Sequence, residues 1–575
     1  MNLFVAIPGV IFAMLSTVVL AYVSMATGAG PWIAPTIVLV SGIILRMHFK
    51  KKNKDEVNEE LVLIQSVGSV GGIVAVGVGF TLPMLHFLDK DLFNSWVQNP
   101  LTFSFTIGII CLGAGGLGIY LARIFSGKLI KKEKLAFPVS NMIYKMIESR
   151  GDKSQTRNML TGLFSTGIFC FLRDGFLRFK GIFPNNINLF TFLGDKFAIP
   201  IFLGPTLIAV GFITGAIITI PLIAGLVSKY LVLYPLNHHS QFLPFELFKP
   251  MQSEMFTMAF VGGLVLEGFV LSSFKYPKII WSSIKVFLNN GSMPWNSGKR
   301  KICEADQQER KEEKVIEEPK KTFIEKLKCG AWLKIETAFV IVLTVSVLSY
   351  FQFSALSQLF MLSLTVIATY QISWMGGKIG LIPFGRFATF IMIPTMLIFN
   401  LSYIQITVLC VFFNVCAAVA SDLLFAYKVG DLCNVSWNKI HRYQWLGLIA
   451  TSVCMGGFLW ILFSGFQVGS PQLFAYRAYS RALLIKSLSF NMWVVGMGAV
   501  YGFVLKKLKI NPMLTLCGIL MPNSLSIGLI LGGLGSLFVK KVIKQDPAVY
   551  STFWSGVFAS ESLCILIGIL LKLFI

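Results

Sequence analysis

Long apolar runs recur along nearly the whole 575-residue chain, separated by short polar segments. A run of about twenty apolar residues predicts a helix that crosses a bilayer, whereas a membrane-spanning strand alternates polar and apolar positions over about ten residues. The pattern therefore predicts an all-α polytopic membrane protein. Clear spans are expected at 3–25, 31–47, 61–88, 101–122, 158–172, 255–274, 335–351, 355–372, 387–400, 404–420, 445–463, 488–505 and 553–574.

Two further apolar stretches, 199–235 and 512–539, are interrupted by glycine and proline. The first resembles the second at an offset of 307 positions. Interrupted hydrophobic stretches at corresponding positions of two halves point to a transporter's site near the middle of the membrane. The matching residues are Pro205, Leu207, Gly211, Ile223 and Gly225 in the first stretch and Pro512, Leu514, Gly518, Ile530 and Gly532 in the second.

The repeat predicts a duplicated two-half bundle of about 14–17 membrane segments with re-entrant or half helices. We expect an N-terminal membrane half at 1–290 and a C-terminal membrane half at 335–575. Residues 291–334 are rich in both signs of charge and hold Pro319, so they predict a cytoplasmic linker.

Composition excludes a soluble or disordered chain, because 55% of residues are hydrophobic, 13% are charged and the mean hydropathy is +0.72. The formal charge of +23 arises from basic residues between the apolar runs, which favours membrane topology over nucleic-acid binding. Basic clusters follow the second and fourth spans, so the N-terminus is expected in the cytoplasm. The first span is too long for a cleaved signal peptide.

The sequence holds few motifs that are typical of enzymes, metal sites or cofactor sites. The ten cysteines include no C-x-x-C pair, and His238-His239 is typical of a solvated loop. Gly113–Gly118 fits G-x-G-x-x-G but lies inside an apolar span, where glycines favour close helix packing over nucleotide binding. We therefore expect no bound metal, no cofactor and no enzymatic activity.

Two acidic residues fall near the middle of expected spans. Glu267 and Glu561 each follow the interrupted stretch of their half, at an offset of 294 positions. A carboxylate near the bilayer centre costs about 2.5–3.5 kcal/mol, so it faces a wet cavity, has a partner or stays protonated. Both are candidates for proton coupling, and the alternative is a protonated glutamate bonded to a neighbouring helix.

A segment rich in glycine and proline, 375–386, separates two apolar runs. Gly376, Gly377, Lys378 and Arg386 are candidates for substrate binding, because irregular backbone at membrane depth lines a cavity or is wrapped by protein. The alternative is an interfacial loop whose cations reach lipid phosphates. Asn523 and Ser524, which follow Pro522, are further candidates because their side chains can satisfy freed backbone groups.

Several segments in their correct order resemble the oligopeptide transporter (OPT) superfamily, nearer its bacterial and yellow-stripe-like branch. The segment from Asp422 through Lys428 to Gly430 is similar to the family's D-x-x-x-D-x-K-x-G motif, with Ala426 in place of the second acid. Leu135–Asn141, which contains Pro138, is similar to the L-x-[YF]-P-S-G segment. Lys428, Gly430 and Pro138 are expected to shape helix ends, and Asp422 is a third candidate for proton coupling.

The resemblance implies about sixteen membrane segments and proton-driven uptake of small peptides or metal chelates. We expect a proton-coupled secondary transporter that uses alternating access, in a bacterial inner membrane. Its expected partners are lipid, protons and a peptide or chelate, a homo-oligomer is left open, and nucleic acid is not expected. An uncoupled channel and a membrane-embedded enzyme acting on lipid are the alternatives.

Overall fold

The structure is a computed structural model, and it describes most of the chain. The described residues are 2–27, 33–48, 54–148, 153–174, 182, 186–188, 200–202, 204–239, 256, 257, 259–261, 263, 264, 323–380, 382, 384–470, 473, 475–486, 492–508, 510, 512, 515, 518, 519, 523–558, 560, 561 and 564. Of the expected linker, residues 291–322 lie outside these ranges.

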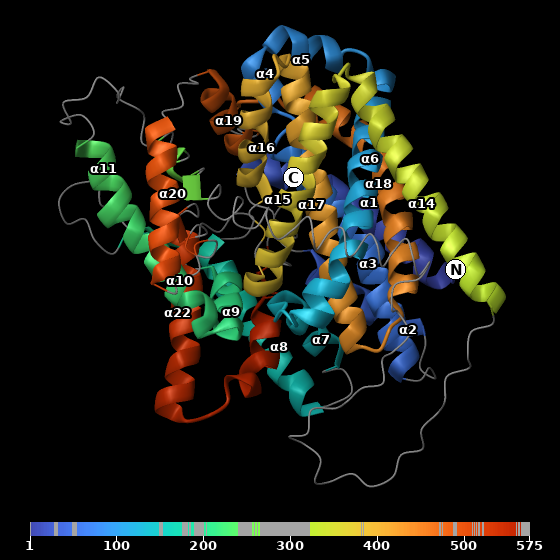
Figure 1. Cartoon of the computed structure of the whole chain (residues 1–575). Helices are drawn as coiled ribbons and strands as arrows, with labels where there is room; N and C mark the ends of the chain where they lie inside the picture. Colours follow the sequence, from blue (N-terminus) through green and yellow to red (C-terminus); the bar gives the residue numbers. More distant parts are fainter. Residues whose placement is uncertain are drawn as a thin grey trace. The chain divides into compact units, whose positions relative to one another are not determined.

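Helices dominate the described residues (Figure 1). In the first part of the chain they are α1 (Leu3–Thr27), α2 (Ala34–His48), α3 (Lys54–Gly79), α4 (Met84–Leu88), α5 (Lys90–Val97), α6 (Pro100–Ser126), the π-helical turn η1 (Gly127–Lys132), α7 (Pro138–Glu148), α8 (Lys153–Asp174), α9 (Pro205–Thr214), α10 (Ala216–Ser228), η4 (Lys229–Leu233) and α11 (Tyr234–His239). Two short strands, β1 (Asn186–Asn188) and β2 (Pro200–Phe202), pair antiparallel.

The later helices begin at Phe323. They are α14 (Phe323–Tyr350), α15 (Ala355–Ile379), α16 (Phe384–Ile398), α17 (Tyr403–Leu432), α18 (Trp437–Gly465), α19 (Tyr476–Lys486), α20 (Met492–Lys507), α22 (Asn523–Phe538), the π-helical turn η5 (Val539–Ile543) and the 3-10 turn η6 (Pro547–Tyr550). Contacts divide the chain into two units, 1–268 with 344–575 and 269–343. The described part of the second unit is the first part of α14.

The first unit has a central helix, α17, which packs against α3, α6, α15, α16 and α18. Its apolar window is wholly buried. Glycines allow the close approach: a side chain at Gly118 would meet the backbone of Cys416, and one at Gly447 would meet the backbone of Val67. The packing interpretation of the Gly113–Gly118 pattern is thus supported at Gly118.

Eight helical runs among the described residues are long and apolar enough to cross a membrane, including 3–25, 100–132 and 403–432. The chain is therefore an all-α polytopic membrane protein. One boundary differs from expectation, since α15 continues through Gly376 and Gly377 to Ile379 and ends at Gly380 with φ 76°. Glycine is tolerated inside a packed helix, so the irregular part of the 375–386 segment is shorter than the sequence pattern suggested.

The first interrupted stretch is broken in the structure. Helix α9 ends at Thr214, Gly215 takes φ 59°, and α10 follows at once. In the second stretch, α22 is described from Asn523, and residues 520–522 lie outside the described residues. Helices α9, α10 and α22 lie side by side (Figure 1).

The 307-position repeat reappears as paired contacts. Side chains at Gly211 and Gly518 would meet the carbonyl oxygens of Leu529 and Leu222. Side chains at Gly532 and Gly225 would meet those of Ile208 and Thr515. In each pair, shifting the residues of one contact by 307 positions gives the residues of the other contact, with the two stretches exchanged. Such reciprocal contacts are those expected of a two-fold axis. The two stretches therefore interleave: α9 packs on α22, and α10 packs on the segment that holds Thr515 and Gly518.

A second pair of contacts follows the same rule on flanking helices. Gly162 on α8 and Gly556 approach the backbones of Phe553 and Met159. Gly498 on α20 and Gly263 approach those of Phe260 and Val495. In these contacts α8 corresponds to α20 at a sequence offset of 336 positions. The segment that begins at 260 corresponds to the segment that begins at 553 at an offset of 293 positions.

The two glutamates are 294 positions apart, and the register of these glycine contacts is 293. Glu267 lies outside the described residues, so its correspondence with Glu561 stays a prediction.

Candidate functional site

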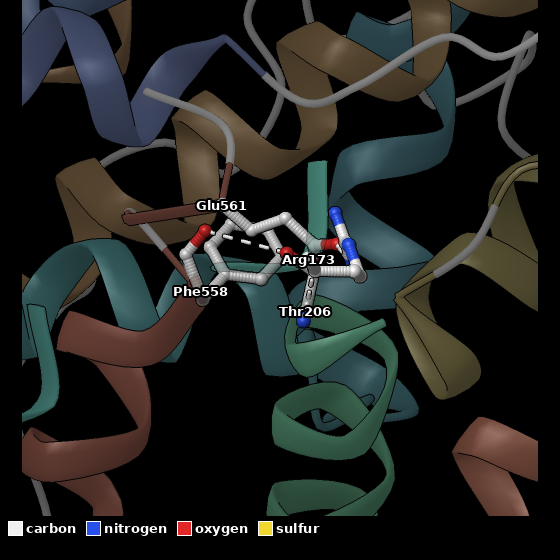
Figure 2. Close-up of polar contacts among 4 residues, drawn as sticks. All are labelled: Arg173, Thr206, Phe558 and Glu561. Carbon is white, nitrogen blue, oxygen red and sulfur yellow. Dashed lines mark hydrogen bonds and ion pairs between the residues drawn. The ribbon is translucent and has the colours of Figure 1, made fainter. Parts of the chain in front are cut away.

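The buried carboxylate of Glu561 joins two elements of the first repeat (Figure 2). Arg173 Nη1, at the end of α8, lies 3.0 Å from Glu561 Oε1. The backbone N–H of Thr206 donates to Glu561 Oε2 at 2.6 Å. Glu561 is 3% exposed and Arg173 is 4% exposed. One carboxylate therefore holds both a buried guanidinium and the N-terminus of α9.

The local sequence explains the position of α9. Gly204 is extended at the N-cap and Pro205 occupies the first turn, where its missing N–H is tolerated. The backbone N–H of Thr206 has no partner within the first turn of the helix, and it donates its hydrogen bond to the Glu561 carboxylate. Negative charge is favourable at a helix N-terminus, so this contact stabilises α9 as a half-helix.

The helix that carries Glu561 is held against α8 by a second contact. Ser560 Oγ donates to the carbonyl oxygen of Leu163 at 2.7 Å, near the glycine contacts of Gly162 and Gly556. Because the backbones meet directly there, the pairing of Glu561 with Arg173 rests on a rigid helix pair. Removing either Glu561 or Arg173 would leave the charge of the other buried without a counter-charge.

Asp422 on α17 is a second buried carboxylate, 1% exposed. It accepts hydrogen bonds from Ser69 Oγ at 2.8 Å and from Gln444 Nε2 at 3.1 Å. Ser66 Oγ donates to Gln444 Oε1 at 2.7 Å. The carboxylate thus lies at the junction of α3, α17 and α18 and is bonded to neutral groups.

Lys378 lies in the last turn of α15, half-buried, with its amine 4.1 Å from the ring centre of Trp374. Gly376 and Gly377 are buried in the same turn, and the N–H of Phe137 donates to Gly377 O at 2.7 Å. Arg386 belongs to α16, and its side chain lies outside the described residues.

The remaining candidates lie at helix ends. Asn523 and Ser524 begin α22, and their side chains lie outside the described residues, as does all of Glu267. Pro138 begins α7 and is buried beside Gly380. Lys428 is half-buried on α17, and Gly430 allows Ile440 of α18 to pack closely.

Metal binding has no support in the part of the chain that the structure describes, where no group of three His, Cys, Asp or Glu side chains gathers. A peptide or a preformed chelate remains compatible with this donor set.

Sequence comparison decides the family. The family model for OPT oligopeptide transporter protein matches residues 1–572. The chain belongs to the OPT oligopeptide transporter family. No curated protein matches it in a sequence search.

Membership in the OPT family makes this a multi-pass membrane protein of an oligopeptide transporter family, and it confirms the resemblance drawn from the motifs. In the OPT motif, Asp422 meets Gln444, which follows it by 22 positions.

The position of Ala426 in the OPT motif has a counterpart on α3. Helices α3 and α17 run antiparallel, because Ser69 contacts Asp422 and Gly77 contacts Asn414. Continuing this register places Gln65 level with Ala426. Gln65 is 1% exposed, and neither atom of its amide has a hydrogen-bond partner among the described residues.

Two basic residues were missed by sequence reasoning. Arg173 lies 388 positions before Glu561, and its place at the end of an apolar run gave no pairing signal. Arg481 on α19 is buried and donates to Phe80 O at the C-terminal end of α3. A cation there complements the helix dipole. Only the folded chain reveals such partners.

Proposed function

We propose that this chain takes up small oligopeptides or metal-chelate complexes by alternating access, driven by a proton gradient. The observation that carries the proposal is the broken helix α9–α10, whose N-terminus is bound by the buried carboxylate of Glu561. Half-helices with buried carboxylates beside them are the usual elements of substrate and ion sites in secondary transporters.

Glu561 is the proposed coupling group. Its negative charge holds Arg173 and the Thr206 N–H, so protonation weakens both contacts and frees the N-terminus of α9. A peptide carboxylate would then be favoured at that N-terminus. Deprotonation of Glu561 on the other face of the membrane would restore its contacts with Arg173 and Thr206, release the peptide and complete co-transport of one proton with it.

Asp422 and Glu267 are proposed as further coupling groups, and Lys378, Arg386, Gly376, Gly377, Asn523 and Ser524 as contributors to the substrate site. Asp422 is supported by its burial among neutral donors. We also propose a bacterial inner membrane and a cytoplasmic N-terminus, supported by the basic residues at the ends of α6 and α22.

The test is uptake into proteoliposomes of short peptides and of Fe(III) chelates, with and without an inward proton gradient. Glu561→Gln should abolish gradient-driven accumulation while leaving exchange of substrate across the membrane. Asp422→Asn and Glu267→Gln are measured in the same way. Glu148→Gln, which removes a half-buried partner of Lys145, is the matched control and should transport normally.

Three results would contradict the proposal. Saturable uptake that is unaffected by the proton gradient and by Glu561→Gln would rule out proton coupling. Uptake that fails to saturate would indicate a channel. Formation of a lipid product in detergent would indicate an enzyme.

A further inference from the structure

The end of α6 carries a dense group of basic residues. The π-helical turn η1 and the two residues after it, together 127–134, are here named the basic turn. It holds Lys128, Lys131, Lys132 and Lys134 and one acidic residue, Glu133. Lys131, Lys132 and Lys134 are exposed. The basic turn therefore presents a strong positive charge to its surroundings.

The backbone fixes the shape of this turn. The N–H of Leu135 donates back to Leu129 O at 3.1 Å, and the N–H of Phe137 bonds to Gly377 O at the end of α15. Lys134 and Phe137 take left-handed φ angles of 46° and 44°. The charges are thus held on a preorganised turn, which reduces the entropy lost when a ligand binds.

Aromatic rings position two of the amines. Lys128 Nζ lies 4.7 Å from the ring centre of Tyr370, and Lys131 Nζ lies 4.7 Å from that of Trp437. Lys378 lies over Trp374 in the same region. Tyrosine and tryptophan are enriched where a membrane protein meets the lipid headgroups.

The acid of this group is already bonded. Glu133 accepts from Tyr370 at 3.3 Å and from Trp374 Nε1 at 3.1 Å, and Lys128 lies 3.6 Å from it. It therefore neutralises only part of the local charge. The lysines therefore keep a net positive charge that attracts a further anion.

The ends of the candidate spans indicate which anion is available. The span that includes α6 ends at Lys132, the α15 span ends at Ile379 and the α18 span begins at Trp437. All three boundaries meet at the basic turn, at the depth of lipid phosphates. We propose that the basic turn binds the headgroup of an anionic phospholipid.

This proposal is independent of what the chain transports. The test uses the purified full chain in neutral detergent, with dioctanoyl-phosphatidylglycerol as the probe and adducts counted by native mass spectrometry. Lys128→Gln/Lys131→Gln should weaken its binding about tenfold or more, since each amine near a lipid surface contributes about 1 kcal/mol. Dioctanoyl-phosphatidylcholine should bind weakly to both forms.

The matched control is Lys540→Gln/Lys541→Gln on η5, which removes the same charge from another π-helical turn. Binding of phosphatidylglycerol by this control variant should stay within about twofold of its binding by the unchanged chain. Lys128→Arg/Lys131→Arg should retain binding, which separates lost charge from misfolding. The proposal is overturned if phosphatidylcholine binds equally well, if the control loses as much binding, or if inorganic phosphate displaces the lipid.

Discussion

Buried charged side chains decide much of what individual residues contribute in this molecule. Glu561 and Arg173 compensate each other across two helices, and Asp422 relies on hydroxyl and amide donors. Desolvation makes an unpaired charge more costly than a lost contact. Removing one member of a pair should therefore differ from removing both.

We expect Arg173→Met to destabilise the protein by about 3–5 kcal/mol, because it leaves the Glu561 carboxylate buried without its cation. The double variant Arg173→Met/Glu561→Met should recover much of that loss. Thermal unfolding in detergent measures both. The partly exposed pair Lys145–Glu148 is the control, and its double variant should change stability by less than about 1 kcal/mol. A double variant as unstable as the single one would contradict this account.

Two glutamines give a second contrast. Gln65→Leu removes a buried amide that has no partner among the described residues, so stability should be unchanged or rise. Gln444→Leu takes partners from both Asp422 and Ser66, so it should cost about 1–3 kcal/mol or more. Unfolding midpoints of the two variants provide the comparison, and equal losses would show that Gln65 has a partner such as bound water.

The sequence was informative about these sites only in part. Glu561 was predictable as a carboxylate at membrane depth, because it stands alone in an apolar run. Its cation was not predictable, because Arg173 belongs to another helix 388 positions away. Asp422 was found by its motif, whereas its partner Ser69 resembles any serine in a span.

Among the helices, glycine sets how closely neighbours approach. At Gly211 and Gly518 a methyl group would meet a carbonyl oxygen, which cannot rotate away as a side chain can. The helices of the two repeats therefore fit only as long as both positions lack a Cβ.

Gly211→Ala and Gly518→Ala should each destabilise the chain by about 1–3 kcal/mol through overpacking. The controls are Gly457→Ala and Gly496→Ala, both in helices, where an added Cβ meets nothing within 4 Å. These controls should be neutral or stabilising, since alanine favours helix by about 1 kcal/mol. The four unfolding midpoints test the close approach, and equal effects at all four positions would refute it.

Hydropathy located most helices but not their ends. Long apolar runs predicted α1, α6, α17 and α18, because length and composition alone are enough for a span. The break at Gly215 followed from the interrupted pattern. The continuation of α15 to Ile379 did not, because its glycines are accommodated by packing against Leu135 and Phe137.

Taken together, the two repeats form an interleaved body with reciprocal contacts. Its helix pairs are joined backbone to backbone, which predicts that α8 and the Glu561 helix move as one. The thiols of Cys170 and Cys564 are hydrogen-bonded beside this ion pair.

Oxidation with copper phenanthroline should join Cys170 to Cys564, and uptake should persist because the pair does not separate during transport. Peptide mass mapping identifies the disulfide, and proteoliposome uptake measures activity. Cys170→Ser is the control that prevents the link. Loss of uptake that returns on reduction would show instead that these helices part.

The reciprocal contacts also bear on the order in which the chain is made. Helices α8, α9 and α10 are synthesised long before the segments from 515 to 556 that contact them. At ordinary translation rates the wait is on the order of tens of seconds. During that time the newly inserted helices expose their glycine-lined faces, so they depend on an insertase or on lipid to shield them. A nascent chain that ends early keeps those faces exposed, and we expect cells to retain little of it.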